Sequence, residues 1–272
     1  MSHTFTALLL AGRRGSTDPV AQSVGCSHKI LVPVVNVPMI VRVLRTLDTA
    51  TCIDRIVVST DAPMLLENFT AIRKLVESGV VEFHVSADSP AASVLDYCQQ
   101  HAKSTPLLVT TADHPLLTSA MVEYFCAEAD RSGADVVAGL VAESLFRSQY
   151  PQSQRSFIPL RGDSFCGTNL FALCTPRATA AVRFWEHAGQ FRKRPWRLIK
   201  TFGLMNFLLL ATKRLDLAAA LPRVSRVLGA RAAAVTLPYA ECAIDVDTLD
   251  DLATVTRILR DREAEEARGV TR

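Results

Sequence analysis

A turn rich in glycine and arginine follows the first apolar run of the chain, residues 5–10. It reads Gly12-Arg13-Arg14-Gly15, and Lys29 stands farther along. Glycine lets a backbone approach a phosphate closely, and successive backbone N–H groups form a concavity that binds anions. Lys29 would add a point charge for the same phosphates. The spacing matches neither the dinucleotide fingerprint nor the P-loop, so an ordinary turn with solvated arginines is the alternative.

A carboxylate stands at the end of a second apolar run, residues 107–111. Asp113 follows this run and precedes Pro115. Because the carboxyl ends of parallel strands face the ligand crevice of an open α/β sheet, Asp113 is well placed to hold Mg²⁺. Mg²⁺ takes oxygen ligands and is usually bound by one or two carboxylates together with substrate phosphates. The alternative is a helix N-cap, a position that aspartate also favours.

Two further carboxylates, Asp245 and Asp247, stand near the end of the chain. They alternate along the sequence, so on a β-strand they would share one face and could complete a metal site with the carboxylate described above. Asp247 or Thr248 could equally cap the helix expected to follow. Asp250 and Asp251 would fall in the first turn of that helix, where negative charge is favourable, and we interpret them as structural.

The apolar runs that carry these residues alternate with helical patterns. This alternation predicts an α/β fold with a doubly wound, mostly parallel mixed sheet flanked by helices. Prolines at 63, 90, 115 and 176 mark helix starts, because proline is well tolerated in a first helical turn. The polar stretch 142–167 should interrupt the parallel order with an antiparallel excursion. The expected strands are 5–10, 55–60, 80–85, 107–111, 134–141, 155–160, 168–174 and 231–237, and the expected helices are 38–49, 63–78, 90–103, 115–130, 176–188, 195–212, 214–228 and 248–262.

Composition places the chain among globular proteins of modest charge. Its 272 residues carry a formal net charge of +3 and include 7 cysteines, which show no pairing pattern. These features predict reduced thiols, a cytoplasmic protein and no nucleic-acid partner. No signal peptide is recognisable, and the apolar stretch 202–211 is about half as long as a membrane span requires.

Three motifs, taken in order, resemble those of the nucleotidyltransferases of the GT-A type, particularly the group similar to molybdenum-cofactor guanylyltransferase. The stretch 10–15, with Lys29 and Pro38-Met39-Ile40, resembles the family's glycine-rich loop, its lysine and the next helix start. The stretch 111–116 resembles its metal-binding aspartate motif, and the stretch 245–252 resembles its closing acidic motif. The resemblance spans nearly the whole chain and implies a Rossmann-like sheet in a single domain.

The resemblance also implies a role for each matching residue. The glycine-rich loop would wrap a nucleoside triphosphate, and Mg²⁺ would be the cofactor. Asp113 and Asp247 would hold the Mg²⁺, with Asp245 as a neighbouring or alternate ligand. Gly167, Thr168 and Asn169 resemble a small-residue motif that borders the acceptor pocket. The implied nucleotide-binding residues are Leu10, Ala11, Gly12, Arg13, Arg14, Gly15, Lys29, Ser89 and Ser93, of which Lys29 and Arg14 would act catalytically with Asp113.

The loop departs from the family pattern in its second half. Residues 16–19 read Ser-Thr-Asp-Pro where a further glycine and an arginine are usual, and Asn36 stands where glycine is common. These departures concern the details of triphosphate binding. We expect one NTP transferase domain over residues 1–260, with 142–228 as an acceptor-side insertion, and a charged, frayed tail over 261–272.

A basic segment precedes an apolar stretch within the expected insertion. Arg192, Lys193 and Arg194 lie close to Trp196, and the run 202–211 follows. Basic and aromatic residues beside an apolar helix are typical of an interfacial element on anionic lipid. Residues 191–214 are therefore a candidate peripheral contact with the inner face of a membrane. The same cations could instead grip a phosphorylated acceptor, and a core helix with a solvated basic entry is the third interpretation.

The resemblance therefore implies a Mg²⁺-dependent nucleotidyltransferase that moves NMP from an NTP, CTP or GTP, to a phosphorylated or hydroxyl acceptor and releases pyrophosphate. The acceptor would be a small molecule or a lipid-linked compound. His114 is interpreted as a packing residue rather than a catalytic base. The alternatives are a GT-A glycosyltransferase that uses a nucleotide sugar and a non-catalytic, membrane-associated nucleotide-binding scaffold. Lys29 favours the first, since a triphosphate needs more cationic neutralisation than a diphosphate sugar.

Overall fold

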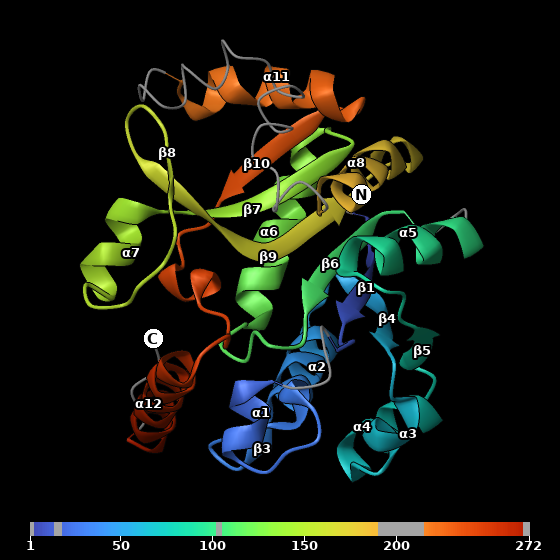
Figure 1. The fold of residues 1–272 in the computed structure, drawn as a ribbon, viewed down its shortest axis with the longest axis vertical. Helices are drawn as coiled ribbons and strands as arrows, with labels where there is room; N and C mark the ends of the chain where they lie inside the picture. The colour runs from blue at the N-terminus through green and yellow to red at the C-terminus, as the bar shows by residue number, and fades with distance from the viewer. Residues whose placement is uncertain (1–2, 14–17, 102–104, 190–214, 269–272) are drawn as a thin grey trace.

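The computed structural model describes residues 3–13, 18–101, 105–189 and 215–268. Within them, an eight-stranded sheet runs in the order β10-β7-β9-β6-β1-β4-β5, and β8 pairs with β9 outside this path. Figure 1 shows the twisted sheet with helices on both of its sides, which confirms the predicted fold class. The strands are β1 (Phe5–Leu10), β4 (Ile53–Thr60), β5 (Val81–Val85), β6 (Leu107–Thr111), β7 (Val136–Ala142), β8 (Ile158–Pro159), β9 (Ser164–Leu173) and β10 (Ala232–Thr236), and a separate hairpin joins β2 (Pro33–Val34) to β3 (Val37–Pro38).

The side chains of β1 explain why both faces of the sheet need helices. Phe5, Ala7 and Leu9 enter a large core, whereas Leu8 enters a smaller one. Successive side chains of a strand point to opposite faces, so a fully buried central strand must be apolar throughout. Helices α2, α6 and α12 contribute to the large core, and α5 and α8 contribute to the small one. The helices are α1 (Pro19–Ser23), α2 (Met39–Thr49), α3 (Pro63–Glu67), α4 (Thr70–Glu77), α5 (Pro90–Gln100), α6 (Ser119–Ser132), α7 (Glu143–Gln149), α8 (Thr179–Gly189), α11 (Leu217–Leu228) and α12 (Leu249–Ala267).

Strand β9 interrupts the parallel order of the sheet. It runs antiparallel between β6 and β7, and β8 folds back antiparallel against it. The predicted antiparallel excursion is therefore present, but its strands differ from the prediction. The expected strand 155–160 shrinks to the two residues of β8, whereas β9 begins at Ser164 rather than at 168.

Two helix predictions need correction. The single helix expected over 63–78 is divided into α3 and α4, because the extended backbone at Phe69 turns its ring against the large core. The helix expected from Pro115 begins instead at Ser119 and is capped by Thr118. Leu116 and Leu117 are buried in the turn before it, so the apolar pattern that suggested a helix belongs to the core. Helix α7 was not predicted.

Helix α12 continues to Ala267, past the expected helix end at 262 and into the stretch expected to be a charged, frayed tail, which stays a prediction. Arg262 fastens this part of the helix to the body of the protein. Its Nη1 donates to the carbonyl of Leu116 at 3.2 Å, and its Nη2 forms an ion pair with Glu241.

The helix expected over 195–212 and the tail beyond residue 268 lie outside the described residues. Among the described helices, none is long and apolar enough to cross a membrane. The proposed boundary of the insertion at 142–228 stays a prediction.

Candidate functional site

The carboxyl ends of β1, β4, β5 and β6 meet at one edge of the sheet and surround a pocket, which we call the strand-end pocket. Open α/β sheets bind their ligands at this edge. Ala11 is fully buried behind the pocket, and Arg14 and Gly15 lie outside the described residues. The other residues that the sequence nominated for nucleotide and metal, Asp245 excepted, line the pocket: Leu10, Gly12, Arg13, Lys29, Ser89, Ser93, Asp113 and Asp247.

Gly12 lies where the turn after β1 passes close to the loop after β5. A Cβ atom at this position would stand 2.8 Å from Ser86 Oγ and 3.0 Å from Ser86 Cβ. A side chain at this position would require the side chain of Ser86 to shift. The close approach of Ser86 therefore accounts for the glycine, in addition to any need to bring the backbone near a phosphate.

Arg13 is bound to a carboxylate that follows β4. Its Nε donates to Asp61 Oδ2 at 2.8 Å, and its backbone N–H donates to Asp61 Oδ1 at 3.2 Å. Partial burial raises the pKa of Asp61, but the hydrogen bonds from Arg13 outweigh it and hold that pKa below its ordinary value. His28 Nε2 lies 3.5 Å from the same carboxylate, and burial lowers the pKa of this histidine. Arg13 thus bonds Asp61 through its backbone N–H and Nε, while its side chain is 45% exposed and lines the strand-end pocket.

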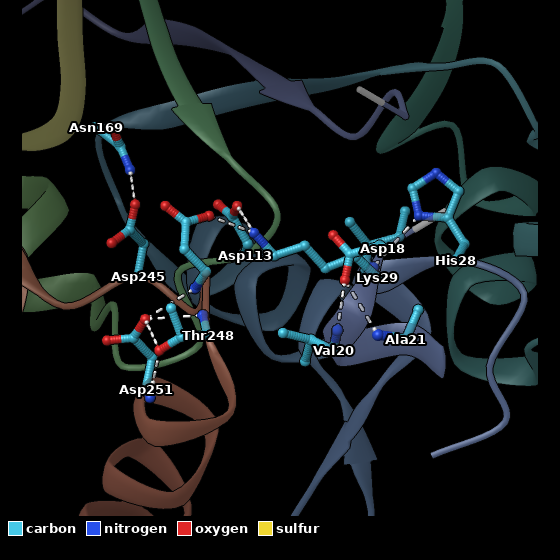
Figure 2. A network of polar contacts seen from close by, with 12 residues as sticks. Asp18, Val20, Ala21, His28, Lys29, Asp113, Asn169, Asp245, Thr248 and Asp251 are labelled. Atoms are coloured by element: carbon cyan, nitrogen blue, oxygen red, sulfur yellow. Dashed lines mark hydrogen bonds and ion pairs between the residues drawn. The ribbon is translucent and has the colours of Figure 1, made fainter. Parts of the chain in front are cut away.

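Lys29 stands at the centre of the site, between two carboxylates that come from distant parts of the chain. It begins a 3-10 turn that the buried His28 caps. Its Nζ donates to Asp113 Oδ2 at 2.8 Å and to Asp247 Oδ1 at 2.6 Å, and Figure 2 shows its side chain extended toward Asp113. Burial lowers the pKa of Lys29, but the two carboxylates outweigh it and hold the pKa above its ordinary value of 10.5. The ammonium group therefore stays charged.

A backbone hydrogen bond brings the two carboxylates together. Asp113 lies in the turn after β6, and its carbonyl accepts a hydrogen bond from the N–H of Val246 at 3.0 Å. Asp247, the next residue, is about half exposed and faces the pocket. Thr248 then caps α12 in a capping box with Asp251, which supports the structural interpretation of Asp251.

Ser89 and Ser93 border the pocket, but their hydroxyl groups are engaged in local structure. Ser89 caps α5 by accepting from the N–H of Ala92 at 3.1 Å. The hydroxyl of the buried Ser93 accepts from the N–H of Ala87 at 2.9 Å and donates to the carbonyl of Ser89 at 3.1 Å. These bonds shape the loop after β5, so both serines act on the pocket through its backbone.

Asp245 does not join the cluster at Lys29. The segment 244–247 is not a strand, so the expectation that Asp245 and Asp247 share a strand face is wrong. One carboxylate oxygen of Asp245 pairs with Arg155, and the other accepts from Asn169 Nδ2 at 2.9 Å. Figure 2 shows Asp245 directed toward Asn169 and away from Lys29.

A second pocket adjoins the first at Asp247, which lines both; we call it the Arg155 pocket. Gly167 and Asn169 line it, whereas Thr168 is buried on the other face of β9. Asn169 has a positive φ of 53°, which few residues other than glycine and asparagine adopt readily. Of the six residues nominated for the acceptor side, Gly167 and Asn169 thus line this pocket. The nominated Arg192, Lys193 and Arg194 lie outside the described residues.

Asp113 and Asp247 suit a magnesium ion. Across the described ranges, no group of three or more His, Cys, Asp or Glu side chains forms a complete metal site. One oxygen each of Asp113 and Asp247 nevertheless converges on a single cation, the ammonium group of Lys29. Mg²⁺ usually needs only one or two carboxylates, since phosphates and water supply its other ligands. The donor set therefore fits Mg²⁺ without Asp245.

His114 follows Asp113 but is fully buried and lines neither pocket. Burial lowers the pKa of its ring, and the carboxylates of Asp245 and Asp113 offset part of that effect. A buried histidine that lines neither pocket agrees with the packing role, since its ring is not exposed to a ligand in either pocket.

Sequence reasoning missed two residues that organise the site. Asp61 directly follows an expected strand, so the signal that identified Asp113 would also have identified it. Arg155 stands 90 residues before its partner Asp245, in a polar stretch without a motif. No local pattern points to it.

Comparison with known proteins places the chain in a wider group. Residues 7–232 match the family model of the MobA-like NTP transferase domain. No curated protein sequence matches the chain. A solved structure of a hypothetical transferase from Thermus thermophilus shares 27% identity with a TM-score of 0.73, over 92% of this chain and 99% of that one.

Two more distant structures share the fold. The 4-diphosphocytidyl-2C-methyl-D-erythritol synthase of Anaerococcus prevotii is 11% identical with a TM-score of 0.56, over 95% of this chain and 97% of that one. A CMP:2-keto-3-deoxy-manno-octonic acid synthetase complexed with CTP is 14% identical with a TM-score of 0.57, over 96% and 100%. At these identities the likeness concerns the fold alone.

Proposed function

Because the chain belongs to the MobA-like NTP transferase family, it is a nucleotidyltransferase, and we propose that its reaction depends on Mg²⁺ and takes place where Lys29, Asp113 and Asp247 meet. The family match favours this reaction over that of a GT-A glycosyltransferase. The strand-end pocket would take the NTP, and the Arg155 pocket would take the acceptor.

One observation carries the proposal. Lys29 Nζ bonds both carboxylates at once, although they lie 84 and 218 residues away along the chain. These three groups also line the strand-end pocket, and charged groups gathered in a cleft are candidates for binding a charged ligand. The cation and the two carboxylates match the needs of a triphosphate with its metal ion.

Asp113 and Asp247 would hold the Mg²⁺, which neutralises charge on the phosphates when it is bound. Lys29 keeps its positive charge in this setting and would stabilise the negative charge that builds up on the triphosphate. In the described part of the turn, the backbone around Gly12 and the guanidinium group of Arg13 would contact phosphate, since Arg13 lines the pocket and bonds Asp61 through only one of its side-chain nitrogens.

The chemistry needs no nucleophile from the protein. An oxygen of the acceptor attacks the α-phosphorus, the bond from that phosphorus to the bridging oxygen breaks, and pyrophosphate leaves with the electron pair. A hydroxyl acceptor would lose its proton to water, whereas an ionised phosphate oxygen carries none. The protein contributes by positioning the reactants and by neutralising charge. Asp247 lines both pockets, so the acceptor oxygen would approach from the side of the Arg155 pocket.

The donor is best identified by binding. We expect one of CTP and GTP to raise the melting temperature in the presence of Mg²⁺, more than UTP or ATP, because a ligand that binds the folded state stabilises it. A similar structure holds CTP, which makes CTP the first nucleotide to try. Absence of any shift with all four nucleotides in the presence of Mg²⁺ would contradict the proposed function.

The acceptor is proposed to be a phosphorylated or hydroxyl compound, either small or lipid-linked. The lipid alternative rests on the sequence of residues 191–214, which lie outside the described residues. Flotation with anionic liposomes at low and high salt tests it, since electrostatic attraction to lipid weakens with salt. No binding in either condition would leave the small-molecule acceptor and a cytoplasmic location.

A further inference from the structure

Both carboxylate oxygens of Asp245 are engaged in contacts with side chains. One pairs with Arg155 Nη1 and the other accepts from Asn169. Asn169 makes this bond from a backbone with positive φ, a conformation that the fold must hold in place. A carboxylate bound on both oxygens is poorly suited to leave for a metal ion. Its contacts suggest a different task.

Arg155 bonds one residue before Asp247 in the sequence and one residue after it. Its Nη2 donates to the backbone carbonyl of Asp245 at 2.7 Å and to Asp251 Oδ1 at 3.0 Å. Asp245 lies two residues before Asp247, and Asp251 lies four residues after it. The planar guanidinium group can hold several acceptors in fixed directions, which an ammonium group cannot.

The second carboxylate oxygen of Asp251 bonds Asp247 and Thr248. Asp251 Oδ2 accepts from the N–H of Asp247 at 3.2 Å, from the N–H of Thr248 at 2.9 Å and from Thr248 Oγ1 at 2.8 Å. The backbone on either side of Asp247 is therefore tied to the same guanidinium group, directly through Asp245 and indirectly through Asp251. We call Arg155, Asp245, Asp251 and Asn169 the Arg155 clamp.

The side chains of the clamp are more buried than that of Asp247, the residue that they flank. The side chains of Arg155, Asp245 and Asp251 are 14%, 19% and 15% exposed, whereas that of Asp247 is 54% exposed. Ion pairs this enclosed are weakly screened, and removing the cation would leave two carboxylates uncompensated in a partly buried place. The clamp is thus enclosed, while the carboxylate of Asp247 lines both pockets.

We propose that Arg155 is a positioning residue: through Asp245 and Asp251 it fixes the backbone around Asp247, so that the Asp247 carboxylate faces Lys29 and Asp113. Asp245 is accordingly a support for the metal-binding side chain and not a metal ligand. The role in metal binding rests on the proposed function, whereas the effect on the backbone does not.

A double-mutant cycle tests the role in metal binding. Mn²⁺ binding is measured by electron paramagnetic resonance in the presence of an α,β-methylene analogue of the NTP that stabilises the protein. We expect Arg155→Met and Asp245→Asn each to weaken Mn²⁺ binding about 10-fold, as loss of a group that orients a metal ligand does. The double variant should bind no more weakly than the weaker single variant, because both act through one unit. Additive losses would mean that Asp245 binds the metal independently and would overturn the proposal.

Three further variants keep this test sound. Arg155→Lys retains the positive charge without the planar guanidinium group, so its Mn²⁺ affinity should lie between those of the wild type and Arg155→Met. Asn169→Gly tolerates the positive φ while removing the amide, so it tests the clamp if Arg155→Met folds poorly. Arg42→Met is the matched control, since Arg42 is a similarly buried arginine that bonds the backbone carbonyls of Val34 and Val35 and lines neither pocket. It should lower the melting temperature without changing Mn²⁺ affinity.

The effect on the backbone is measured without nucleotide or metal. Amide hydrogen exchange over residues 244–251 should be faster in Arg155→Met than in the wild type and in Arg42→Met, because Asp251, which accepts from the N–H groups of Asp247 and Thr248, is no longer held by Arg155. Unchanged exchange overturns the proposal whatever the protein binds. Faster exchange in a protein whose wild type binds no Mn²⁺ with any NTP analogue would support the clamp and contradict the proposed function.

Discussion

Two cations of the site, Lys29 and Arg155, each stand between two carboxylates, and each is about 15% exposed. They differ in what they hold. Lys29 bonds only the side chains of Asp113 and Asp247, whereas Arg155 also bonds a backbone carbonyl. A lysine ammonium is a point charge on a flexible stem, while a guanidinium is a planar fork. The comparison teaches that similar burial and charge can serve a group that meets a ligand or a group that supports the chain.

The largest expected effect is on kcat, and it should differ between the carboxylates bound by Lys29 and those bound by Arg155. We expect Asp113→Asn to lower kcat about 10³-fold, since it removes charge where the phosphates are neutralised, and Asp245→Asn to lower it only about 10-fold. Pyrophosphate release with the stabilising NTP, Mg²⁺ and an acceptor that supports turnover measures both, with melting temperatures as the control for folding. Equal losses in the two variants would remove the distinction between them.

The second effect concerns the cations themselves. Lys29→Met should lower kcat/KM about 10²-fold, because the positive charge beside the phosphates is lost. Lys29→Arg should recover little of it, since the larger planar group does not fit between Asp113 and Asp247 in the place of an ammonium. Steady-state kinetics of pyrophosphate release give the comparison. Full activity of Lys29→Arg would show that charge alone matters at this position.

A smaller effect contrasts the glycines of the two pockets. Gly12→Ala should destabilise the protein by about 1–3 kcal/mol, because its Cβ would collide with Ser86. Gly167→Ala meets nothing within 4 Å and should change the free energy of unfolding by less than about 0.5 kcal/mol. Urea unfolding followed by circular dichroism measures both. A larger loss for Gly167→Ala would mean that the Arg155 pocket is more tightly packed than its open glycine indicates.

The smallest effect is the pH dependence beside the strand-end pocket. Burial lowers the pKa of His28 below its ordinary 6.5, with partial compensation by Asp61. The unfolded chain therefore binds the proton more readily, so stability is full above pH 6.5 and falls as the pH drops below it, by at most about 1.4 kcal/mol per pH unit. His28→Asn, which keeps an acceptor for the N–H of Ile30, should flatten this decline in thermal unfolding from pH 7.5 to pH 5. The buried His114, whose pKa shifts in the same direction, should leave a residual slope.

The parts of the molecule that depend on local pattern were predictable from the sequence. Strands β1 and β6 have the bounds that their apolar runs predicted, because a strand buried on both faces must be apolar throughout. Asp113 follows from the end of such a strand. Its meeting with Lys29 and Asp247 was implied by the order of three motifs, which also led to the family that the comparison confirms.

The parts that depend on distant contacts were not predictable. Arg155 belongs to no motif, and its importance comes from Asp245 and Asp251, which it meets only in the folded chain. The alternation of Asp245 and Asp247 suggested a strand, but hydrogen bonds outside any sheet set the backbone there. A carboxylate's partner, and hence its role, is decided by tertiary contacts that a sequence pattern does not contain.

Strand β9 has a consequence for how the chain is made. Strands β1, β4, β5 and β6 can pair with one another once residues 5–111 have been synthesised, but β7 joins them only through β9. Until residues 164–173 leave the ribosome, one edge of β6 has no neighbour and β7 has no place in the sheet. An open strand edge is a template for wrong pairing. The growing chain, rather than the finished protein, is thus the stage at which this sheet is most vulnerable.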